Sequence, residues 1–393
     1  MTNYLIRRGL QMILVVFAAT IAIFILLNAV PGGPLSGLNL GGDQKSRLSE
    51  QDIARIERTL GLNRPMYMSY LTWMFGEDWL DEMGNALGNP DLNDKLLFTG
   101  TWSDYQSPTC AENGGSNEGL EGRLPPCSRG IIRLDFGESW KLASGVPVTE
   151  ILGSRVWNTI RLTAIASLVS LLVAVPIGII SAVKQYSKLD YVVTTFSFFG
   201  ISMPAFWFGL MLIIFMLWLQ NNGLPFLPTG NVVDLRVIPG SVSDLLNIKP
   251  GSYADYAVHL VLPVMMLSLL SMAGWSRFMR SSMLEVLRQD YVRTARAKGL
   301  RERTVIVKHA ARNALIPLIT IVVFEIPSIF GGAIITETIF NYPGMGRLFI
   351  TALSASDWPI VMAYLFISAI LVVIATLIGD VLYTIVDPRI RFE

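Results

Sequence analysis

The chain has 393 residues, of which 52% are hydrophobic and only 16% are charged, and its formal net charge is +1. Its mean hydropathy of +0.49 lies outside the range of ordinary soluble proteins. These values indicate a membrane protein with several spans. A nearly neutral chain also offers no general attraction for nucleic acid or for an acidic substrate.

Six apolar segments are each long enough to cross a bilayer, which requires roughly 20 residues at about 1.5 Å of rise per residue. The first has Arg7 and Arg8 before it and Pro-Gly-Gly-Pro after it instead of a cleavage site, so we expect a retained anchor and not a signal peptide. The prediction is an all-α membrane protein with six transmembrane helices. The segments are about Leu10 to Val30, Thr159 to Val183, Val192 to Leu219, His259 to Met279, Ala314 to Thr336 and Ile360 to Val386.

The short loops between these segments alternate in charge. Basic loops stay on the cytoplasmic side of a membrane, and an even number of spans places both chain ends on one side. We therefore expect both termini in the cytoplasm and the outer segments to be residues 31–158, 220–258 and 337–359. The residues that set this orientation are Arg7, Arg8, Lys184, Lys188, the basic residues from Arg277 to Arg312, Arg389 and Arg391.

These boundaries divide the chain into four parts. Residues 1–30 hold the N-terminal segment and the first span, and residues 31–158 form a large extracytoplasmic region between the first two spans. Residues 159–386 hold the other five spans together with a cytoplasmic loop at 280–313. Residues 387–393 form a cytoplasmic C-terminus.

The large outer region divides into three parts, two of which have a distinctive composition. Leu48 to Phe75 has apolar residues at helical spacing, which predicts one or two amphipathic surface helices. Residues 76–131 are rich in Gly, Asn, Pro and Asp and contain the two cysteines of the chain, Cys110 and Cys127. On the oxidising side of the membrane these cysteines favour a disulfide, which would stabilise the loop by about 3 kcal/mol. The alternative is two free thiols, and a metal site there is disfavoured because no histidine lies nearby.

The usual catalytic constellations are missing from the sequence. The chain has two histidines, His259 and His309, so neither a histidine-based triad nor a zinc site is expected, and no catalytic, cofactor or metal residue is assigned. It also lacks the GxxxxGK[ST] loop that binds nucleotide phosphates. If ATP drives transport, we expect ATP and Mg²⁺ to bind partner subunits.

The loop at 280–313 is the most informative feature of the chain. From Arg277 to Arg312 it carries about ten Lys or Arg and about three Asp or Glu, which predicts a cytoplasmic location. Ala295, Ala297 and Gly299 interrupt the charges with small residues that allow another protein to approach the backbone. The pattern indicates a docking element, and the alternative is a loop that binds only anionic lipid.

Motifs along almost the whole chain resemble one family, the permease subunits of oligopeptide and dipeptide ABC importers, a class that also includes nickel transporters. The resemblance implies the type I importer permease fold in the cytoplasmic (inner) membrane of a prokaryote. Residues 76–131 fall outside it. The motifs are YLIRRGLQ, AVPGGP, LGLNRPMYMSYLTWMFG, LDFGESW, GVPVTEIL, PIGIISAVKQYSKLDY, GISMPAFWFGLML, MLEVLRQDYVRTARAKGL, HAARNALIP, IFNYPGMGRLF and DVLYTIVDPRIRF.

In this family a cytoplasmic coupling helix, with a Glu-Ala-Ala triplet before a glycine, fits into a groove of an ATPase. Here Arg293-Thr294-Ala295 precedes Gly299, so the Glu is missing, as in the peptide-transporter branch. The resemblance implies a homologous second permease subunit, two ABC ATPase subunits and an extracytoplasmic substrate-binding protein. The residues expected to contact the ATPase are Asp290, Tyr291, Arg293, Thr294, Ala295, Arg296, Ala297, Lys298, Gly299 and Leu300.

Three residues are candidates for the translocation path. Glu325 is an ionisable residue in the fifth span, where burial of a charge is expensive, and we expect it to contact a peptide amine or to form an internal hydrogen bond. Met203 and Phe206 belong to an aromatic cluster around Pro204 that either lines the path or packs against helices and lipid. Pro204 itself acts either as a hinge or as a static kink.

The expected function is import of short peptides by alternating access, with nickel chelates, opines or oligosaccharides as alternative cargo. An ion-coupled secondary transporter would have an inverted repeat, which the sequence lacks. A membrane-embedded enzyme would need paired acidic or histidine residues at one depth, and Glu325 alone does not provide them. The insertion at 76–131 either shapes the docking of the binding protein or is a tolerated surface elaboration.

Overall fold

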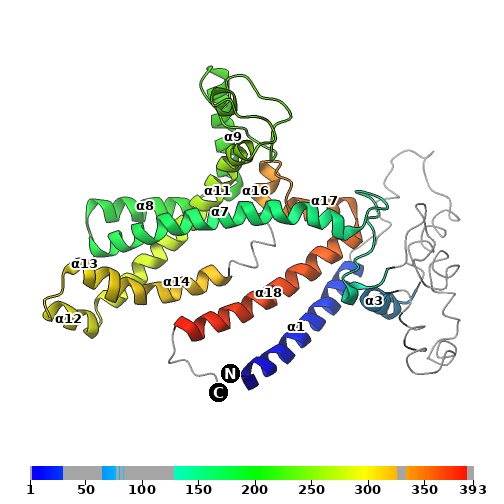
Figure 1. The fold of residues 1–393 in the computed structure, drawn as a ribbon, viewed down its shortest axis with the longest axis horizontal. Coiled ribbons are helices and arrows are strands. Elements are labelled where there is room, and N and C mark those ends of the chain that lie inside the picture. Colours follow the sequence, from blue (N-terminus) through cyan, green and yellow to red (C-terminus); the bar gives the residue numbers. More distant parts are fainter. Residues whose placement is uncertain are drawn as a thin grey trace. The chain divides into compact units, whose positions relative to one another are not determined.

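The computed structural model describes residues 2–29, 64–76, 79, 83, 128–324 and 333–386. Regular structure in this part of the chain is helical, with isolated β-bridges that pair Glu138 with Pro147 and Phe226 with Ser241 (Figure 1). The expected all-α fold is confirmed. The elements are α1 (Thr2–Asn28), α3 (Met66–Phe75), η3 (Ile131–Arg133), α7 (Val148–Val183), α8 (Lys188–Ser202), α9 (Ala205–Asn221), α10 (Val242–Leu245), α11 (Tyr253–Leu287), α12 (Asp290–Ala297), α13 (Glu302–Thr304), the π-helix η4 (Val305–Ala311), α14 (Arg312–Phe324), α16 (Ile334–Ile339), α17 (Met345–Ala355) and α18 (Trp358–Val386).

Five of the described helical segments are long and apolar enough to cross a membrane, and the pair α8 and α9 brings the number to six if it forms one broken span. The fifth segment differs from its expected bounds, because the helical run begins at Glu302 and passes through η4 into α14, whereas the sequence predicted Ala314 as its start. The single segments are Arg7–Asn28, Val148–Val183, Tyr253–Leu287, Glu302–Val322 and Trp358–Ile378.

The third apolar segment is broken, which corrects the expectation of one continuous helix from Val192 to Leu219. α8 ends at Ser202, α9 begins at Ala205, and the two axes differ by 101° (Figure 1). Pro204 causes the break because a proline disfavours helical geometry in the residue before it. Met203 accordingly has an extended backbone, with φ −79° and ψ 125°.

The chain divides into two compact units. One comprises Met1–Leu10, Arg155–Leu348 and Ile370–Glu393, and the other comprises Gln11–Ser154 and Phe349–Ala369. This division follows packing and does not test the expected division by membrane side.

In the unit that contains α3, aromatic rings form the main contacts. Tyr70 lies edge-on to Phe24 of α1 with ring centroids 5.4 Å apart, and its hydroxyl lies 2.9 Å from the hydroxyl of Thr20. Trp73 contacts Phe366 with centroids 6.5 Å apart. Of the one or two amphipathic surface helices predicted within Leu48 to Phe75, the structure describes a helix at Met66–Phe75, which has no charged residue, and residues 48–63 lie outside the described part of the chain.

The same unit contains a carboxylate enclosed by hydrogen-bond donors. Asp357 is fully buried, and it accepts hydrogen bonds from the Ser139 hydroxyl (2.6 Å) and from the backbone amides of Trp140, Lys141 and Leu142 (2.9–3.1 Å). A carboxylate with several such donors is well compensated for its loss of water. Asp357 therefore fixes the end of the LDFGESW motif and the two residues after it against the start of α18.

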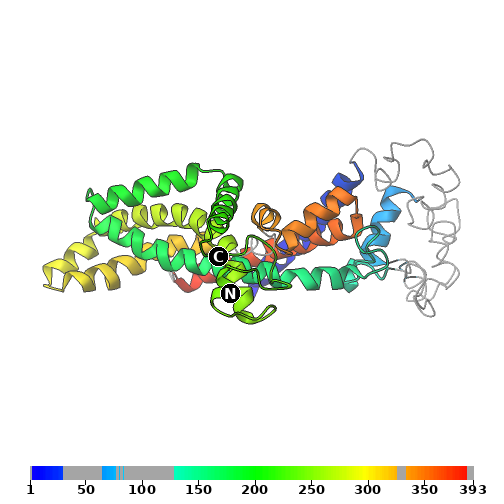
Figure 2. The ribbon, with the colours of Figure 1, turned by 90° about the horizontal axis from the view of Figure 1, so that it is seen from above.

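In the other unit, α11 packs against α8, α9 and α14 (Figure 2). Its core lies between the end of α7, the middle of α11 and the run from α12 to α14, and Trp275 belongs to it. Three helices of this unit begin with Ser-x-x-Asp, in which the serine hydroxyl accepts a hydrogen bond from the aspartate amide and so caps the helix start. These pairs are Ser187 with Asp190, Ser241 with Asp244 and Ser252 with Asp255.

Candidate functional site

Residues within and just after α12 explain why this short helix forms and where it ends. Asp290 provides a negative charge in its first turn and Arg296 a positive charge in its last, and both complement the helix dipole. Gly299 has a φ of +71°, a left-handed conformation that ends helices and that glycine adopts without steric cost. The helix ends at Ala297, close to the predicted range of Asp290 to Leu300.

One face of α12 belongs to the core of its unit. Val292 and Ala295 are buried at 0% and 6% exposure, and they join a cluster with Met283 of α11 and Val305 and Ala310 of η4. The small side chain of Ala295 thus serves packing within the chain, whereas the sequence suggested that it faces a partner. The internal face gives α12 a fixed position relative to α11 and η4.

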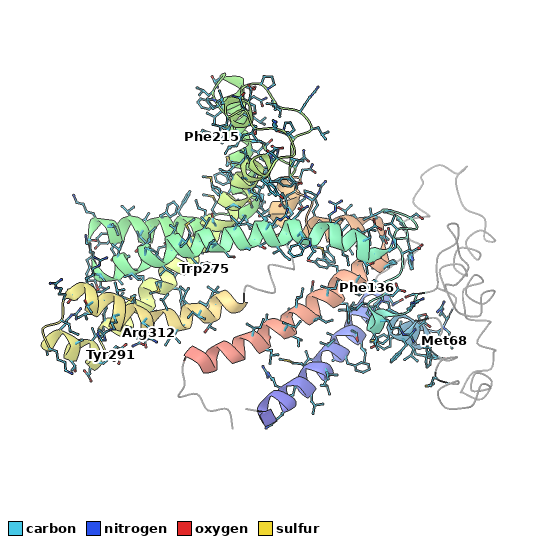
Figure 3. All side chains as sticks on the ribbon, viewed as in Figure 1. Met68, Phe136, Phe215, Trp275, Tyr291 and Arg312 are labelled. Carbon is cyan, nitrogen blue, oxygen red and sulfur yellow. The ribbon has the colours of Figure 1, made fainter. Side chains whose placement is uncertain are left out.

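The opposite face of α12 is exposed. Tyr291, labelled in Figure 3, lies on this helix, and 42% of it is accessible. Apart from Ala295, all the residues expected to contact a partner are exposed, namely Asp290, Tyr291, Arg293, Thr294, Arg296, Ala297, Lys298, Gly299 and Leu300. The arrangement forms a small, basic surface on a helix whose other face is held by apolar packing.

The charges on this surface are locally ordered. The guanidinium of Arg296 contacts the Glu302 carboxylate at 2.7 Å between Nη2 and Oε1, and a second ion pair joins Arg293 to Asp290 at 3.5 Å. The hydrogen bond to Glu302 raises the pKa of Arg296. The pair closes the turn after α12 and leaves the neighbouring Lys298 and Arg301 exposed.

The exposed surface of α12 connects directly to long helices. α11 leads into α12 through Arg288 and Gln289, and η4 continues into α14 without a break (Figure 1). The Ser282 hydroxyl donates a hydrogen bond to the backbone carbonyl of Ala314, 2.9 Å away, which ties α11 to α14. A π-helix such as η4 is rare and is frequently found at functional sites. Any displacement of α12 would therefore pass into α11 and α14.

The structure describes two of the three residues predicted to line the translocation path. Met203 is partly buried at the bend between α8 and α9, and Phe206 in the first turn of α9 is 54% exposed. Glu325, Cys110 and Cys127 lie outside the described residues, so the path assignment of Glu325 and the disulfide stay predictions.

A buried carboxylate that the sequence analysis missed organises the NYPGMGRLF motif. Glu337 accepts hydrogen bonds from the Thr159 hydroxyl (2.8 Å) and the Arg347 amide (2.9 Å), and Thr159 accepts one from the Met345 amide (2.7 Å). Burial raises the pKa of Glu337, although these hydrogen bonds act in the opposite direction. A Cβ at Gly344 would clash with the Glu337 carboxyl group, so a larger residue there would displace this carboxylate. The Pro-Gly-x-Gly turn next to an acidic residue was the available signal.

Comparison with known proteins gives consistent results. Residues 174–392 match the family model described as "Binding-protein-dependent transport system inner membrane component", and residues 1–85 match the model for the N-terminal part of such components. The chain is 36% identical to the oligopeptide transport system permease protein AppB of Bacillus subtilis and 30% identical to the dipeptide transport system permease protein DppB of Escherichia coli, with full coverage of all chains.

Among solved structures, the chain is similar to the MetNI methionine ABC transporter in inward-facing conformations. The identity is 15% and the TM-score is 0.44, with 61% of this chain and 97% of that chain covered.

Proposed function

The chain belongs to the family of inner membrane components of binding-protein-dependent transport systems, and we propose that it is the permease subunit of an ATP-driven importer of short peptides. The observation that carries the proposal is similarity over the full chain to two peptide permeases, at 36% and 30% identity. Family membership and the apolar helices make the chain a multi-pass protein of the inner membrane.

The coupling helix in this proposal is α12. Its exposed basic face, from Asp290 to Leu300, sits in a groove of an ABC ATPase, while Val292 and Ala295 hold it to its own unit. Closure of two ATPases on ATP would bring two such helices together. The movement passes through α11 and α14 and switches the permease from inward-facing to outward-facing.

The importer also requires other chains. Its partners are a homologous second permease, two ATPases and an extracytoplasmic binding protein, and ATP and Mg²⁺ bind the ATPases and not this chain. With six spans, both termini and the loop at 280–313 lie in the cytoplasm, and residues 31–158 lie outside. Met203 and Phe206 at the bend, together with Glu325, line the path on one side. Surrounding lipid covers the remaining apolar surface.

Transport in proteoliposomes tests this function. The chain is reconstituted with its partner permease, both ATPases and the binding protein, and uptake of labelled di- to pentapeptides is measured with and without ATP. We expect ATP-dependent accumulation of peptide that requires the binding protein. Accumulation of only nickel chelates or oligosaccharides would overturn the peptide assignment. Uptake that needs an ion gradient and no ATPase would overturn the importer.

A further inference from the structure

Two carboxylates and an imidazole come together at the N-terminal end of α11. Asp255 and His259 lie one turn apart on this helix, and Asp234 approaches from the loop that precedes α10. One potential ligand atom from each of the three residues lies within 4.8 Å of the other two. Asp255 and His259 are 1% and 2% exposed, and the side chain of Asp234 is 14% exposed. The group is separate from the coupling surface of α12.

Each of the three side chains has a buried polar atom that forms no hydrogen bond with the described residues, namely Asp234 Oδ2, Asp255 Oδ1 and His259 Nε2, although Asp255 Oδ1 lies 3.2 Å from Nδ1 of His259. The other oxygen of Asp255 accepts hydrogen bonds from the amides of Asp234 (3.1 Å) and Gly251 (2.9 Å). Buried polar groups in native proteins normally have partners, and each one left without a partner costs about 1–3 kcal/mol. The cluster therefore has free coordination capacity for a further ligand.

The orientation of the imidazole indicates the charge of that ligand. Nδ1 of His259 lies 2.9 Å from the backbone carbonyl oxygen of Asp255. A carbonyl only accepts, so Nδ1 carries a hydrogen, and the other ring nitrogen, Nε2, faces Asp234. Nε2 and Asp234 Oδ1 are 3.4 Å apart. Two electron-rich atoms at this distance repel each other unless a cation lies between them.

The same distance favours a metal ion over a proton. Hydrogen bonds between nitrogen and oxygen are usually about 2.7–3.2 Å long, which is shorter than the separation between Nε2 and Oδ1. Two ligand atoms at about 2.0–2.1 Å from a tetrahedral Zn²⁺ are about 3.3 Å apart, which matches it. The hydrogen bond from Nδ1 to a backbone carbonyl is also the usual outer support of a histidine ligand.

We propose that Asp234, Asp255 and His259 bind a divalent transition-metal ion, with Zn²⁺ as the best-matched ion. His259 supplies Nε2 and each aspartate supplies one oxygen, which leaves one position of a tetrahedral ion for water. The metal neutralises two buried carboxylates and joins the loop before α10 to the first turns of α11. Counting histidines alone argued against a metal site, and the signal in the sequence was the Asp-x-x-x-His pair after the Ser252 cap.

Metal binding is tested on the full-length chain, purified in detergent through a tag without histidines. The chain is treated with chelator and desalted, and Zn²⁺ is added back. Bound metal is measured by plasma mass spectrometry, the unfolding temperature is recorded with and without Zn²⁺, and the visible spectrum is recorded with Co²⁺. The variants are His259→Gln and Asp234→Asn. His309→Gln is the matched control, because the chain has two histidines.

We expect about one Zn²⁺ per chain, a higher unfolding temperature with Zn²⁺ and a tetrahedral Co²⁺ spectrum. His259→Gln and Asp234→Asn should each weaken Zn²⁺ binding by at least about tenfold, and His309→Gln should leave it unchanged. Asp234 lies in a loop, so its variant keeps the test valid if His259→Gln fails to fold. A wild-type chain without bound Zn²⁺ and with no thermal response to it would overturn the proposal and leave a proton as the cation. Binding that depends on His309 would overturn it as well.

Discussion

Arg280 of α11 binds Asp190 of α8 through two parallel hydrogen bonds, 2.7 Å from Nε to Oδ1 and 2.9 Å from Nη2 to Oδ2. Asp190 is 3% exposed and also accepts hydrogen bonds from the Ser181 hydroxyl and the Tyr186 amide. The turn between α7 and α8 is therefore fixed to the helix that leads into α12. Burial of the Asp190 carboxylate is compensated by these hydrogen bonds, and loss of one partner of such an ion pair destabilises the folded chain.

Substitution of Asp190 by Asn should destabilise the chain strongly. Removal of one partner of a buried ion pair leaves the other charge uncompensated and costs about 3–5 kcal/mol. The measurement is the unfolding temperature of the purified chain in detergent, which should fall well below that of the wild type.

Glu302→Gln is the matched control for this substitution. Glu302 pairs with Arg296, and their side chains are 55% and 43% exposed. An exposed ion pair contributes only about 0–1 kcal/mol to the free energy of unfolding. Equal losses in the two variants would show that the enclosure of Asp190 has no energetic consequence. Arg280→Lys should fall between them, because lysine cannot form the paired hydrogen bonds.

Two glycines should respond oppositely to alanine. A Cβ at Gly178 of α7 would lie 2.7 Å from both Met279 Cβ and Ser276 O of α11, whereas a Cβ at Gly274 meets nothing within 4 Å. We expect Gly178→Ala to destabilise by about 1–3 kcal/mol through overpacking. Gly274→Ala should gain about 0.5–1 kcal/mol because alanine favours helix. The same thermal unfolding assay measures both, and a neutral Gly178→Ala would show that the two helices are not in close contact there.

Glu337 should make stability depend on pH. Its pKa is raised in the folded chain, chiefly by burial, so the folded state holds its proton more tightly than the unfolded state. This contribution is fully present below the unfolded pKa of about 4.3 and is lost as pH rises through the higher folded value. The unfolding temperature of the wild type should therefore fall relative to that of Glu337→Gln as pH increases above about 4.3.

The reference in this comparison is the Gln variant itself, since it cannot titrate at position 337. A difference between the two proteins that stays constant with pH would show that Glu337 keeps an ordinary pKa. An unfolding temperature of the wild type that rises relative to that of Glu337→Gln with increasing pH would show that the hydrogen bonds from Thr159 and Arg347 outweigh burial.

The features that depend on local composition, namely the apolar spans and α12, could be predicted from the sequence. Apolar length located the spans, and charge together with Gly299 located α12 almost to its ends. Hydropathy carries no information about direction, so it missed the 101° bend, although Pro204 indicated where the helix could break. The helix that contains the fifth span begins before Ala314, because a helical run can continue into polar residues that an apolar segment does not include.

Contacts between residues far apart in the chain were beyond reach from one sequence. Asp190 and Arg280 are 90 positions apart, and Thr159 and Glu337 are 178 apart. Nothing in the sequence around any of these four residues distinguishes it from other polar residues. Only the packing of α7, α8 and α11 makes the Asp190 and Arg280 charges meet, so their burial and pairing could not be predicted.

The central claim is that the exposed face of α12 docks into an ATPase. Gly299 has open space around its Cβ position within the chain, so a bulky side chain there would meet only a partner. Gly299→Ala is the matched control, because it has the same left-handed backbone strain without the bulk.

The most direct measurement is the amount of ATPase that copurifies with wild type, Gly299→Ala and Gly299→Trp from cells that produce the whole importer. We expect Gly299→Ala to retain the ATPase and peptide-stimulated hydrolysis, and Gly299→Trp to lose both while its own unfolding temperature matches that of Gly299→Ala. Copurification and stimulation by Gly299→Trp at the wild-type level would contradict the account.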